Sequence, residues 1–313
     1  MLRLSRRHGV NIGYVGLGNM GGALARRLLL RHSLHVYDLS ATAVEALVDL
    51  GAKACSSLAE LASVCDTIFL CLPTSNHVRE MLFGEGGIAS ALRRGTMIVD
   101  QTTGDPMATA EMARQIAALG SELIDAPVSG GIQGAEAGTI AIMVGAHAPQ
   151  FERISPILAS ISKNVFHAGA PQAGQVIKLV NNMLSAAQRL LSFEGMALAV
   201  KNGVDPQKAC EILVAGGARN VFLEKFMASH ILKGDLYSGF TLGLMHKDVR
   251  LACELGSDSG VPMLFGNLTR DFYQICINEF GKDAQVHSAA LMVDRCSGSK
   301  LVPKNSDYES RVN

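Results

Sequence analysis

A glycine-rich turn near the start of the chain places the strongest constraint on its fold. The stretch IGYVGLGNMG contains Gly16, Gly18 and Gly21, which match the pattern G-x-G-x-x-G. An apolar run at 11–15 precedes these glycines and an amphipathic segment at 20–30 follows them, so we expect a strand, a tight turn and a helix. In this context the glycines let backbone amides approach a pyrophosphate at the helix N-terminus.

Short apolar runs alternate with helical patterns through the first half of the chain. Candidate strands lie at 11–15, 34–38, 66–71, 96–100, 121–125, 139–144 and 164–167. Candidate helices between them include 40–50, 57–63 and 106–119. Several of the strand runs are continuously apolar, as expected when helices cover both faces of a sheet. The alternation therefore predicts an α/β domain of the Rossmann type, with a mostly parallel sheet, over residues 10–170.

Beyond about residue 170 only helical patterns remain. They lie at 171–201, 206–215, 219–232, 241–259, 262–280 and 284–296, with Gly and Pro residues at the boundaries. The first of them predicts a long interdomain helix over 171–201. The others predict an all-α domain over 202–297 that serves substrate binding and oligomerisation. Residues 298–313 have no helical periodicity and are expected to form a disordered tail.

The composition argues against several classes of protein. Lys plus Arg and Asp plus Glu number 28 each, so the charge gives no reason to expect a nucleic-acid or membrane partner. No apolar run is long enough for a transmembrane helix. The seven cysteines are most simply interpreted as buried thiols in a reducing compartment, which favours a cytoplasmic protein. The basic start MLRLSRRHG lacks an apolar signal-peptide core, although a transit peptide stays open.

An acidic residue follows the glycine turn at the spacing of dinucleotide-binding units. Asp38 ends the second candidate strand, roughly 20 residues after the glycines. A carboxylate at this place accepts hydrogen bonds from the hydroxyls of an adenosine ribose. Leu39 and Ser40 follow it and supply no cation for a 2′-phosphate, so the sequence favours NAD over NADP. The alternative is a glycine-rich turn with a packing role alone.

A second glycine-rich turn, DAPVSGG, follows the candidate strand at 121–125. Ser129, Gly130 and Gly131 can present consecutive N–H groups and a hydroxyl to a carboxylate. Ligands of open α/β sheets bind beyond the carboxyl ends of the strands, where this turn is expected. On these residues alone, an ordinary β-turn is an equal alternative.

The predicted long helix carries an unusual polar stripe in the stretch GQVIKLVNN. Lys178, Asn181 and Asn182 lie within one helical turn of one another. A lysine beside an alcohol oxygen can take or return the hydroxyl proton during hydride transfer, and its charge stabilises an alkoxide. Its ordinary pKa of ~10.4 would have to be lowered by burial, or water would have to relay the proton. The alternative is a lysine that snorkels at the edge of an apolar helix.

Taken together, these motifs resemble the β-hydroxyacid dehydrogenase family, which includes 3-hydroxyisobutyrate dehydrogenase and tartronate semialdehyde reductase. The resemblance covers about residues 11–296. The family's cofactor signature GLGxMG is matched by Gly16, Leu17, Gly18, Asn19, Met20 and Gly21. Its substrate turn is matched at 125–131 and its lysine motif by QAGQVIKLVNN. The resemblance implies hydride transfer between NAD and the β-carbon of a small hydroxy acid, such as 3-hydroxyisobutyrate or glycerate.

The resemblance also implies roles for individual residues. Lys178 would be the general acid and base, and Asn182 would bind the substrate. Ser129, Gly130 and Gly131 would bind the substrate as well. Lys247, in the segment LMHKD, would lie near the nicotinamide and the substrate carboxylate.

Further cofactor contacts follow from the same resemblance. Leu72 and Pro73 would line the adenosine side, and Thr103 would lie at the nicotinamide ribose, with Thr102 as the alternative register. The sequence departs from the family pattern at three places: Gln172 replaces the first glycine of the lysine motif, Gln101 replaces a residue that is commonly small, and residues 31–33 (RHS) replace a Gly-His turn before the second strand.

Other readings of the same motifs stay open. The 6-phosphogluconate dehydrogenase branch carries a histidine beside the asparagine, imine reductases replace the lysine, and chromatin-binding relatives lack it. Lys178 and the neutral charge argue against all three. A non-catalytic NAD-binding regulator or scaffold is the remaining alternative.

The sequence also bears on metal binding and on subunit association. Five histidines do not cluster with acids or cysteines at metal-ligand spacing, so we expect no metal; they are His35, His77, His147, His167 and His246. The long helix is apolar on more than one face, which predicts a homodimer or homotetramer.

Overall fold

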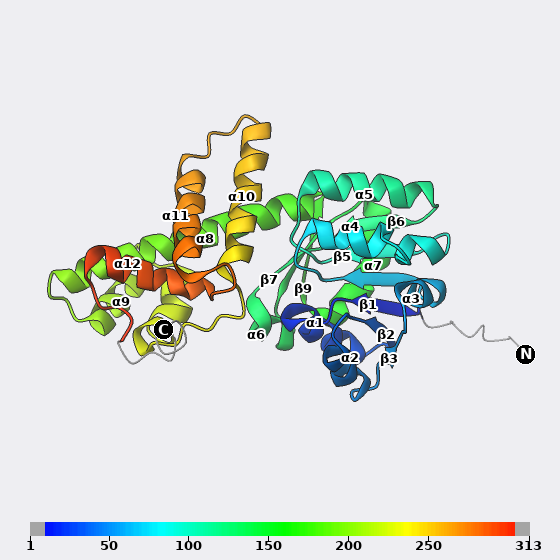
Figure 1. The fold of residues 1–313 in the computed structure, drawn as a ribbon, viewed down its shortest axis with the longest axis horizontal. Helices are drawn as coiled ribbons and strands as arrows, with labels where there is room; N and C mark the ends of the chain where they lie inside the picture. The colour runs from blue at the N-terminus through cyan, green and yellow to red at the C-terminus, as the bar shows by residue number, and fades with distance from the viewer. Residues whose placement is uncertain (1–9, 304–313) are drawn as a thin grey trace, which may run out of the picture. The chain divides into compact units, whose positions relative to one another are not determined.

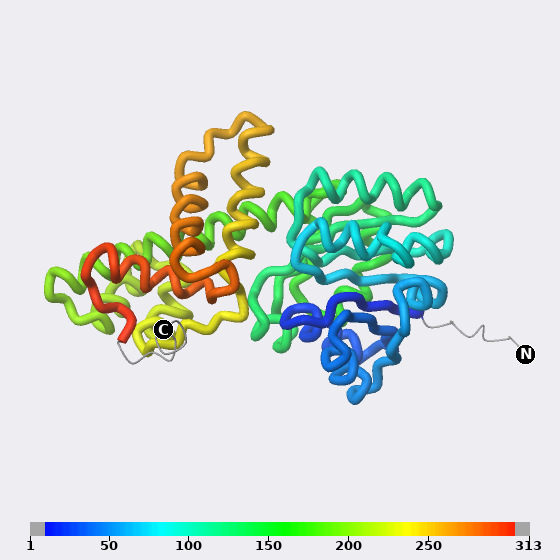
Figure 2. The backbone as a smooth tube through the Cα atoms, viewed as in Figure 1, coloured from blue at the N-terminus to red at the C-terminus, as the bar shows by residue number. Residues whose placement is uncertain are grey.

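The computed structural model describes residues 10–303. The described residues divide into two compact units, residues 10–178 and residues 179–303. Figure 1 shows a first unit of strands and helices and a second unit of helices alone, as the sequence predicted. Figure 2 follows the same backbone as a continuous tube.

A nine-stranded, mostly parallel sheet forms the centre of the first unit. Its strands are β1 (Ile12–Val15), β2 (Leu34–Tyr37), β3 (Lys53–Ala54), β4 (Thr67–Leu70), β5 (Met97–Asp100), β6 (Glu122–Asp125), β7 (Val128–Ser129), β8 (Ala141–Gly145) and β9 (Asn164–Gly169). The order is β3-β2-β1-β4-β5-β6-β8-β7, with β9 on β8. Strands β1 to β6 are parallel, whereas β8 is antiparallel to β6 and β7. The order reverses between β1 and β4, which makes the carboxyl ends of these strands the expected ligand site of a doubly wound sheet.

Helices cover both faces of this sheet. They are α1 (Asn19–Leu29), α2 (Ala41–Val48), α3 (Leu58–Val64), α4 (Ser75–Phe83), α5 (Pro106–Ala118), α6 (Gly131–Glu136) and α7 (Ala148–Ile161), with a short 3₁₀ turn, η1 (Ile88–Ala91). Consecutive strand residues face opposite sides: Tyr14 packs in the core with α1 and α7, and Val15 in the core with α3, α4 and α5. Because both sides are apolar, the strands read as continuous hydrophobic runs.

Helix α8 (Ala173–Lys201) begins in the first unit and continues through the second. Its start matches the predicted interdomain helix to within two residues. It is preceded by Gln172, which has a φ of 75° and is the non-glycine residue with positive φ in the described chain. None of the helices within residues 10–303 is long and apolar enough to cross a membrane.

The second unit packs its helices around an apolar core. After α8 come α9 (Pro206–Ala215), a π-helical turn η2 (Leu223–Met227), 3₁₀ turns η3 (Ile231–Lys233) and η4 (Val286–Ser288), and helices α10 (Leu242–Asp258), α11 (Leu264–Phe280) and α12 (Ala289–Ser297). Helices α10 and α11 lie side by side as a hairpin (Figure 1). The buried faces of α8, α10 and α11 contribute Phe193, Leu242 and Tyr273 to the core, each with no exposed surface.

One helix prediction in this unit was wrong. We expected a regular helix over 219–232, but the segment contains the π-helical turn η2 and the 3₁₀ turn η3 instead. The side chain of Asn220 accepts hydrogen bonds from the backbone N–H groups of Phe222 and Leu223, both at 3.0 Å. This local cap competes with the regular helical pattern.

The expected disordered tail was also wrong at its beginning. Leu301 and Val302 are only 2% and 6% exposed and pack into the core of the second unit. Their backbone N–H groups donate to the carboxylate of Asp294, at 2.9 and 3.0 Å. Two apolar residues among polar ones gave no periodicity from which this packing could be predicted. Residues 304–313 lie outside the described residues.

The core of the second unit encloses a histidine. His287 is 1% exposed, and its ring centroid lies 5.7 Å from that of Phe222 and 5.5 Å from that of Phe226. Burial, followed by the charge of Arg189, lowers the pKa of His287 to about 3. The imidazole is therefore neutral in the folded protein at every pH near neutrality.

This burial predicts a loss of stability in mild acid. The unfolded chain protonates His287 below about pH 6.5, whereas the folded chain does not until about pH 3. The free energy of unfolding should therefore fall as the pH drops through this window, by about 2 kcal/mol at pH 5. Urea unfolding at pH 5 and pH 7.5 would show this difference in the wild type and a smaller one in His287→Phe. An equal pH dependence in both proteins would contradict the prediction; His77→Phe, at an exposed histidine, is the control.

Candidate active site

Glycine occurs at each of the three positions of the first motif for a different structural reason. Gly16 has a φ of 90°, and a Cβ there would clash with the carbonyl oxygen of Cys71. A Cβ at Gly21 would clash with the carbonyl oxygen of Gly16, so α1 can approach the strand only because this residue is glycine. A Cβ at Gly18 would meet no atom of the described residues within 4 Å. Gly18 is thus the glycine whose open side leaves room for a ligand.

The N-terminus of α1 lies directly behind this open glycine. Gly18 occupies the N-cap position and has no side chain to bond the first N–H groups of the helix. Those amides and the helix dipole favour an anion at this end. Leu17 is buried, Met20 is half-buried and Asn19 is exposed beside the turn. The residues present therefore fit the pyrophosphate of a dinucleotide.

Asp38, at the end of β2, faces the same turn. Its Oδ2 accepts the backbone N–H of Leu17 at 2.6 Å, and its Oδ1 accepts that of Ser40 at 2.7 Å. Two backbone amides thus fix the direction of a half-buried carboxylate beside the glycines. This geometry fits the recognition of ribose hydroxyls, because an ionised carboxylate is an acceptor only.

The loops after β4 and β5 are tied to each other. The N–H of Leu72 donates to Oγ1 of Thr102 at 3.0 Å, and the N–H of Thr102 donates to Oδ1 of Asp100 at 2.9 Å. Thr102 is 1% exposed, so its hydroxyl serves this internal contact. Pro73 is exposed and Thr103 is half-buried.

Lys178 lies at this edge of the sheet. The residue is 8% exposed, and its positive charge acts on the thiol of Cys71, at the end of β4. Burial, and then the charge of Asp100, raise the pKa of that thiol to about 12, while the Tyr14 hydroxyl and Lys178 lower it. Cys71 is also the residue whose carbonyl lies against Gly16. Cys71 thus borders the glycine turn through its backbone, while its thiol responds to the charge of a lysine that is far away in sequence.

Asp125 attaches the lysine helix to the sheet. At the end of β6, its Oδ1 accepts the N–H of Gln172 and its Oδ2 that of Gln175, both at 2.8 Å. Burial raises the pKa of Asp125 to about 6, although these amides and that of Gly174 oppose the shift. The carboxylate of Asp125, which belongs to the sheet and not to the helix, thus caps the N-terminus of α8.

The second glycine-rich turn differs from the simple turn that its sequence suggested. Ser129 belongs to the short strand β7 and lies opposite Ala141 of β8. Gly130 and Gly131 follow, with φ values of 142° and 69°, and α6 begins at Gly131. Both glycines are exposed and Ser129 is half-buried. Glycine is favoured at both positions because of these positive φ values, whether or not an anion binds there.

The second unit contains its own polar cluster. Nδ2 of Asn182 donates to Oδ2 of Asp248 at 2.6 Å, and Nζ of Lys247 lies 3.0 Å from Oδ1 of the same carboxylate. Nδ2 of Asn181 donates to Oδ1 of Asn182 at 3.0 Å. Asp248 is 1% exposed, so one buried carboxylate orients both residues that the sequence predicted for substrate binding in this unit.

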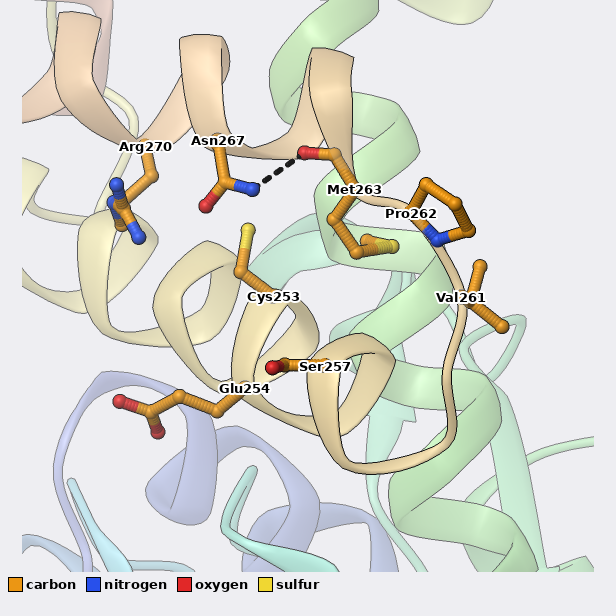
Figure 3. Close-up of a pocket in the computed structure, with 8 residues that line it drawn as sticks. All are labelled: Cys253, Glu254, Ser257, Val261, Pro262, Met263, Asn267 and Arg270. Carbon is orange, nitrogen blue, oxygen red and sulfur yellow. Dashed lines mark hydrogen bonds between the residues drawn. The ribbon is translucent and has the colours of Figure 1, made fainter.

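A surface hollow between α10 and α11 carries no comparable chemistry (Figure 3). It is lined by Cys253, Glu254, Ser257, Val261, Pro262, Met263, Asn267 and Arg270. Glu254 pairs with Arg250 at 2.6 Å, and the Asn267 amide donates to Met263 O of its own helix at 2.7 Å. Burial raises the pKa of Cys253, which opposes thiolate formation.

Comparisons with known proteins agree with this geometry. Residues 11–169 match the model of the NAD binding domain of 6-phosphogluconate dehydrogenase, and residues 172–293 match that described as NAD-binding of NADP-dependent 3-hydroxyisobutyrate dehydrogenase. The chain is 40% identical to 2-(hydroxymethyl)glutarate dehydrogenase of Eubacterium barkeri, over 81% of this chain and 85% of the relative. It is 34% identical to 3-hydroxyisobutyrate dehydrogenase of Pseudomonas aeruginosa, over 85% and 91%.

A solved structure gives the same result. The 3-hydroxyisobutyrate dehydrogenase of Mycobacterium tuberculosis, described with L-serine, has a TM-score of 0.81 at 27% identity and covers 91% of this chain and 99% of its own. The fold and the nucleotide site thus define an NAD(P)-dependent oxidoreductase. The chain belongs to the β-hydroxyacid dehydrogenase family, as its motifs indicated.

Two residues of these polar contacts, Asp248 and Gln175, were missed in the sequence analysis. Asp248 was only one letter of the LMHKD segment, and no spacing rule connects it to Asn182. Gln175 precedes Lys178 by three residues, so helical periodicity places it on the same side of α8. That spacing was the available signal for it.

Proposed function

We propose that this protein is an NAD-dependent dehydrogenase of a small β-hydroxy acid, with Lys178 as the general acid and base. The observation that carries the proposal is the attachment of α8 to the carboxyl end of β6 through Asp125, which holds the buried Lys178, on the next turn of α8, near the edge of the sheet that bears the glycine turn. A cation held beside a nucleotide site, at the carboxyl ends of β1 and β4, is placed for proton transfer next to a bound cofactor.

Each site residue would have its own role in this reaction. The glycine turn and Asp38 would hold NAD, which would supply the acceptor for the hydride of the alcohol β-carbon. Lys178, as the neutral amine, would accept the hydroxyl proton, and the ammonium formed in this way would stabilise the developing alkoxide. Asn182 orients the substrate, while Ser129, Gly130 and Gly131 bind it through N–H and O–H donors and Lys247 binds its carboxylate. In the reverse direction Lys178 returns the proton.

The nucleotide contacts are part of the same proposal. Leu17 and the glycine turn hold the pyrophosphate, Asp38 binds the adenosine ribose, and Leu72 and Pro73 line the adenosine side. Since the Thr102 hydroxyl already accepts the N–H of Leu72, Thr103 is the better candidate for the nicotinamide ribose.

A substrate panel tests the proposed reaction and the role of Lys178. NADH formation would be followed with 3-hydroxyisobutyrate, 2-(hydroxymethyl)glutarate, glycerate, 4-hydroxybutyrate, serine and threonate. With the acid that reacts fastest, Lys178→Met should lower kcat by on the order of 10²–10⁴ because the proton acceptor is lost. NADH binding, measured by fluorescence titration, should change little, and Lys201→Met on the same helix is the matched control. Near-normal turnover in Lys178→Met would contradict the mechanism, and wild-type silence across the panel would favour a non-catalytic NAD-binding protein.

Asp38 should decide the choice between NAD and NADP. Its carboxylate would repel a 2′-phosphate and accept ribose hydroxyls, so Asp38→Ser should lower kcat/KM with NAD and raise the NADP to NAD ratio by on the order of tenfold, about 1.4 kcal/mol. Steady-state kinetics with both cofactors measures that ratio. Asp49→Ser, at an exposed carboxylate on the surface after α2, is the control. An unchanged ratio would mean that another residue reads the ribose.

We also propose that a second copy of the chain covers one face of α8. Ile177, Leu184, Leu191 and Leu198 recur every seventh residue, and their exposed fractions are 45%, 49%, 66% and 68%. Side chains at this spacing form one continuous stripe along a helix. Soluble monomers rarely expose an apolar patch of this length, and a helix stripe can pair with its own copy about a two-fold axis.

Sedimentation tests this subunit contact. The wild type should sediment as a dimer or tetramer of the 33.1 kDa chain, and the double variant Leu191→Glu with Leu198→Glu should shift toward the monomer. Leu30→Glu changes an equally exposed leucine, at 69%, outside the stripe and should leave the mass unchanged. A wild-type monomer at micromolar concentration would refute the contact.

A further inference from the structure

A buried glutamine contacts the backbone on both sides of Thr103. Nε2 of Gln175 donates to the carbonyl oxygen of Thr102 at 2.7 Å, and its Oε1 accepts the N–H of Gly104 at 2.9 Å. Gln175 has no exposed surface. Its single amide therefore fixes the peptide groups that flank Thr103, the residue proposed for the nicotinamide ribose.

The same residue is fixed from a third direction. The backbone N–H of Gln175 donates to Oδ2 of Asp125 at 2.8 Å. Gln175 thus connects the loop after β5 to the end of β6, and it does so within the first turn of α8. These contacts are all inside the first unit.

Because Gln175 and Lys178 belong to the same helix, fixing Gln175 also fixes the backbone that carries Lys178. Residues three apart lie on the same side of a helix, so Gln175 and Lys178 move together as parts of one rigid turn. The surroundings allow little adjustment. A Cβ at Gly104 would clash with Oγ of Ser75, which itself accepts the N–H of Asp105 at 2.9 Å.

Both hydrogen bonds are hard to replace. The carbonyl of Thr102 and the N–H of Gly104 lie in buried surroundings, where an unsatisfied backbone group is strongly unfavourable. No other amino acid of this length supplies a donor and an acceptor together. Glutamate retains the acceptor for Gly104 but loses the donor to Thr102, and methionine loses both.

We propose that Gln175 is a positioning residue that sets the distance between the nicotinamide loop at Thr103 and the amino group of Lys178. The assignment rests on the proposed function for its kinetic consequences, whereas its structural content does not depend on turnover. Gln175 itself does not contact the reacting atoms in the proposed mechanism. It acts by fixing the loop at Thr103 relative to the first turns of α8, the helix that carries Lys178.

Three variants test this role. In Gln175→Met both hydrogen bonds are absent, in Gln175→Glu one is retained, and Gln188→Met makes the same change at an exposed position of α8. With the best acid of the panel, kcat should fall on the order of 30-fold in Gln175→Met and less in Gln175→Glu, while KM for the acid stays within threefold. The apparent pKa in the kcat–pH profile should move by at least about half a unit. Gln188→Met should match the wild type in all three measurements.

A second measurement follows Lys178 without turnover. Competitive acetylation with acetic anhydride from pH 6 to pH 11, read by mass spectrometry, gives the titration midpoint of each lysine. The midpoint of Lys178 should shift in Gln175→Met and not in Gln188→Met, while that of exposed Lys53 stays constant. Amide hydrogen exchange at Gly104 should accelerate at least tenfold in the same variant.

The outcomes separate the two proposals. If the wild type converts no acid, the proposed function fails, and the acetylation and exchange data still decide the role of Gln175. Wild-type values of the Lys178 midpoint and of the kcat–pH profile in Gln175→Met, with only a lower melting temperature, would show a purely structural glutamine and overturn the inference. If Gln175→Met does not fold, Gln175→Glu decides by the same readouts.

Discussion

The capping of α8 by Asp125 is the interaction on which the first unit's polar site depends. The carboxylate stands where two backbones come close: a Cβ at Gly145 would lie 2.5 Å from its oxygens, and one at Gly174 would lie 2.7 Å from Oδ2. Both positions therefore require glycine. Burial raises the pKa of Asp125 to about 6, so the ionised form is costly, and the amides of Gln172 and Gln175 offset that cost. The carboxylate and the helix end thus stabilise each other.

This capping also explains how the chain tolerates a departure from the family pattern. Gln172 stands where the lysine motif normally begins with glycine, and its φ of 75° is a conformation that costs a side-chain-bearing residue on the order of 1 kcal/mol. The N–H of Gln172 is one of the two amides bonded to Asp125. The hydrogen bond to a charged acceptor is of at least similar strength, so it can hold the residue in this conformation. The direction of α8, and with it the place of Lys178, is preserved although the glycine is not.

The sequence revealed those parts of the structure that depend on short-range patterns. Continuous apolar runs located β1, β4 and β5 because each face of the sheet is covered, and the glycine turn identified the start of α1. Strands β3 and β7 were missed, since two residues carry no periodicity. The π-helical turn η2 was missed because it depends on where the Asn220 side chain bonds. Gln175 was missed for a related reason: its amide contacts residues some 70 positions away, and such contacts exist only once the sheet has assembled.

Three carboxylates recur in these polar contacts for one physical reason. An ionised carboxylate only accepts hydrogen bonds, so an amide that faces it must present its N–H side. Asp248 therefore fixes the orientation of the Asn182 amide, whose Oδ1 then accepts from Asn181. Asp38 and Asp125 act on backbone amides in the same way. In this arrangement the Asn181 side chain adds a second hydrogen bond to the Asn182 amide. A neutral acceptor such as asparagine could rotate by half a turn in each place, and the direction of the neighbouring donor would no longer be determined.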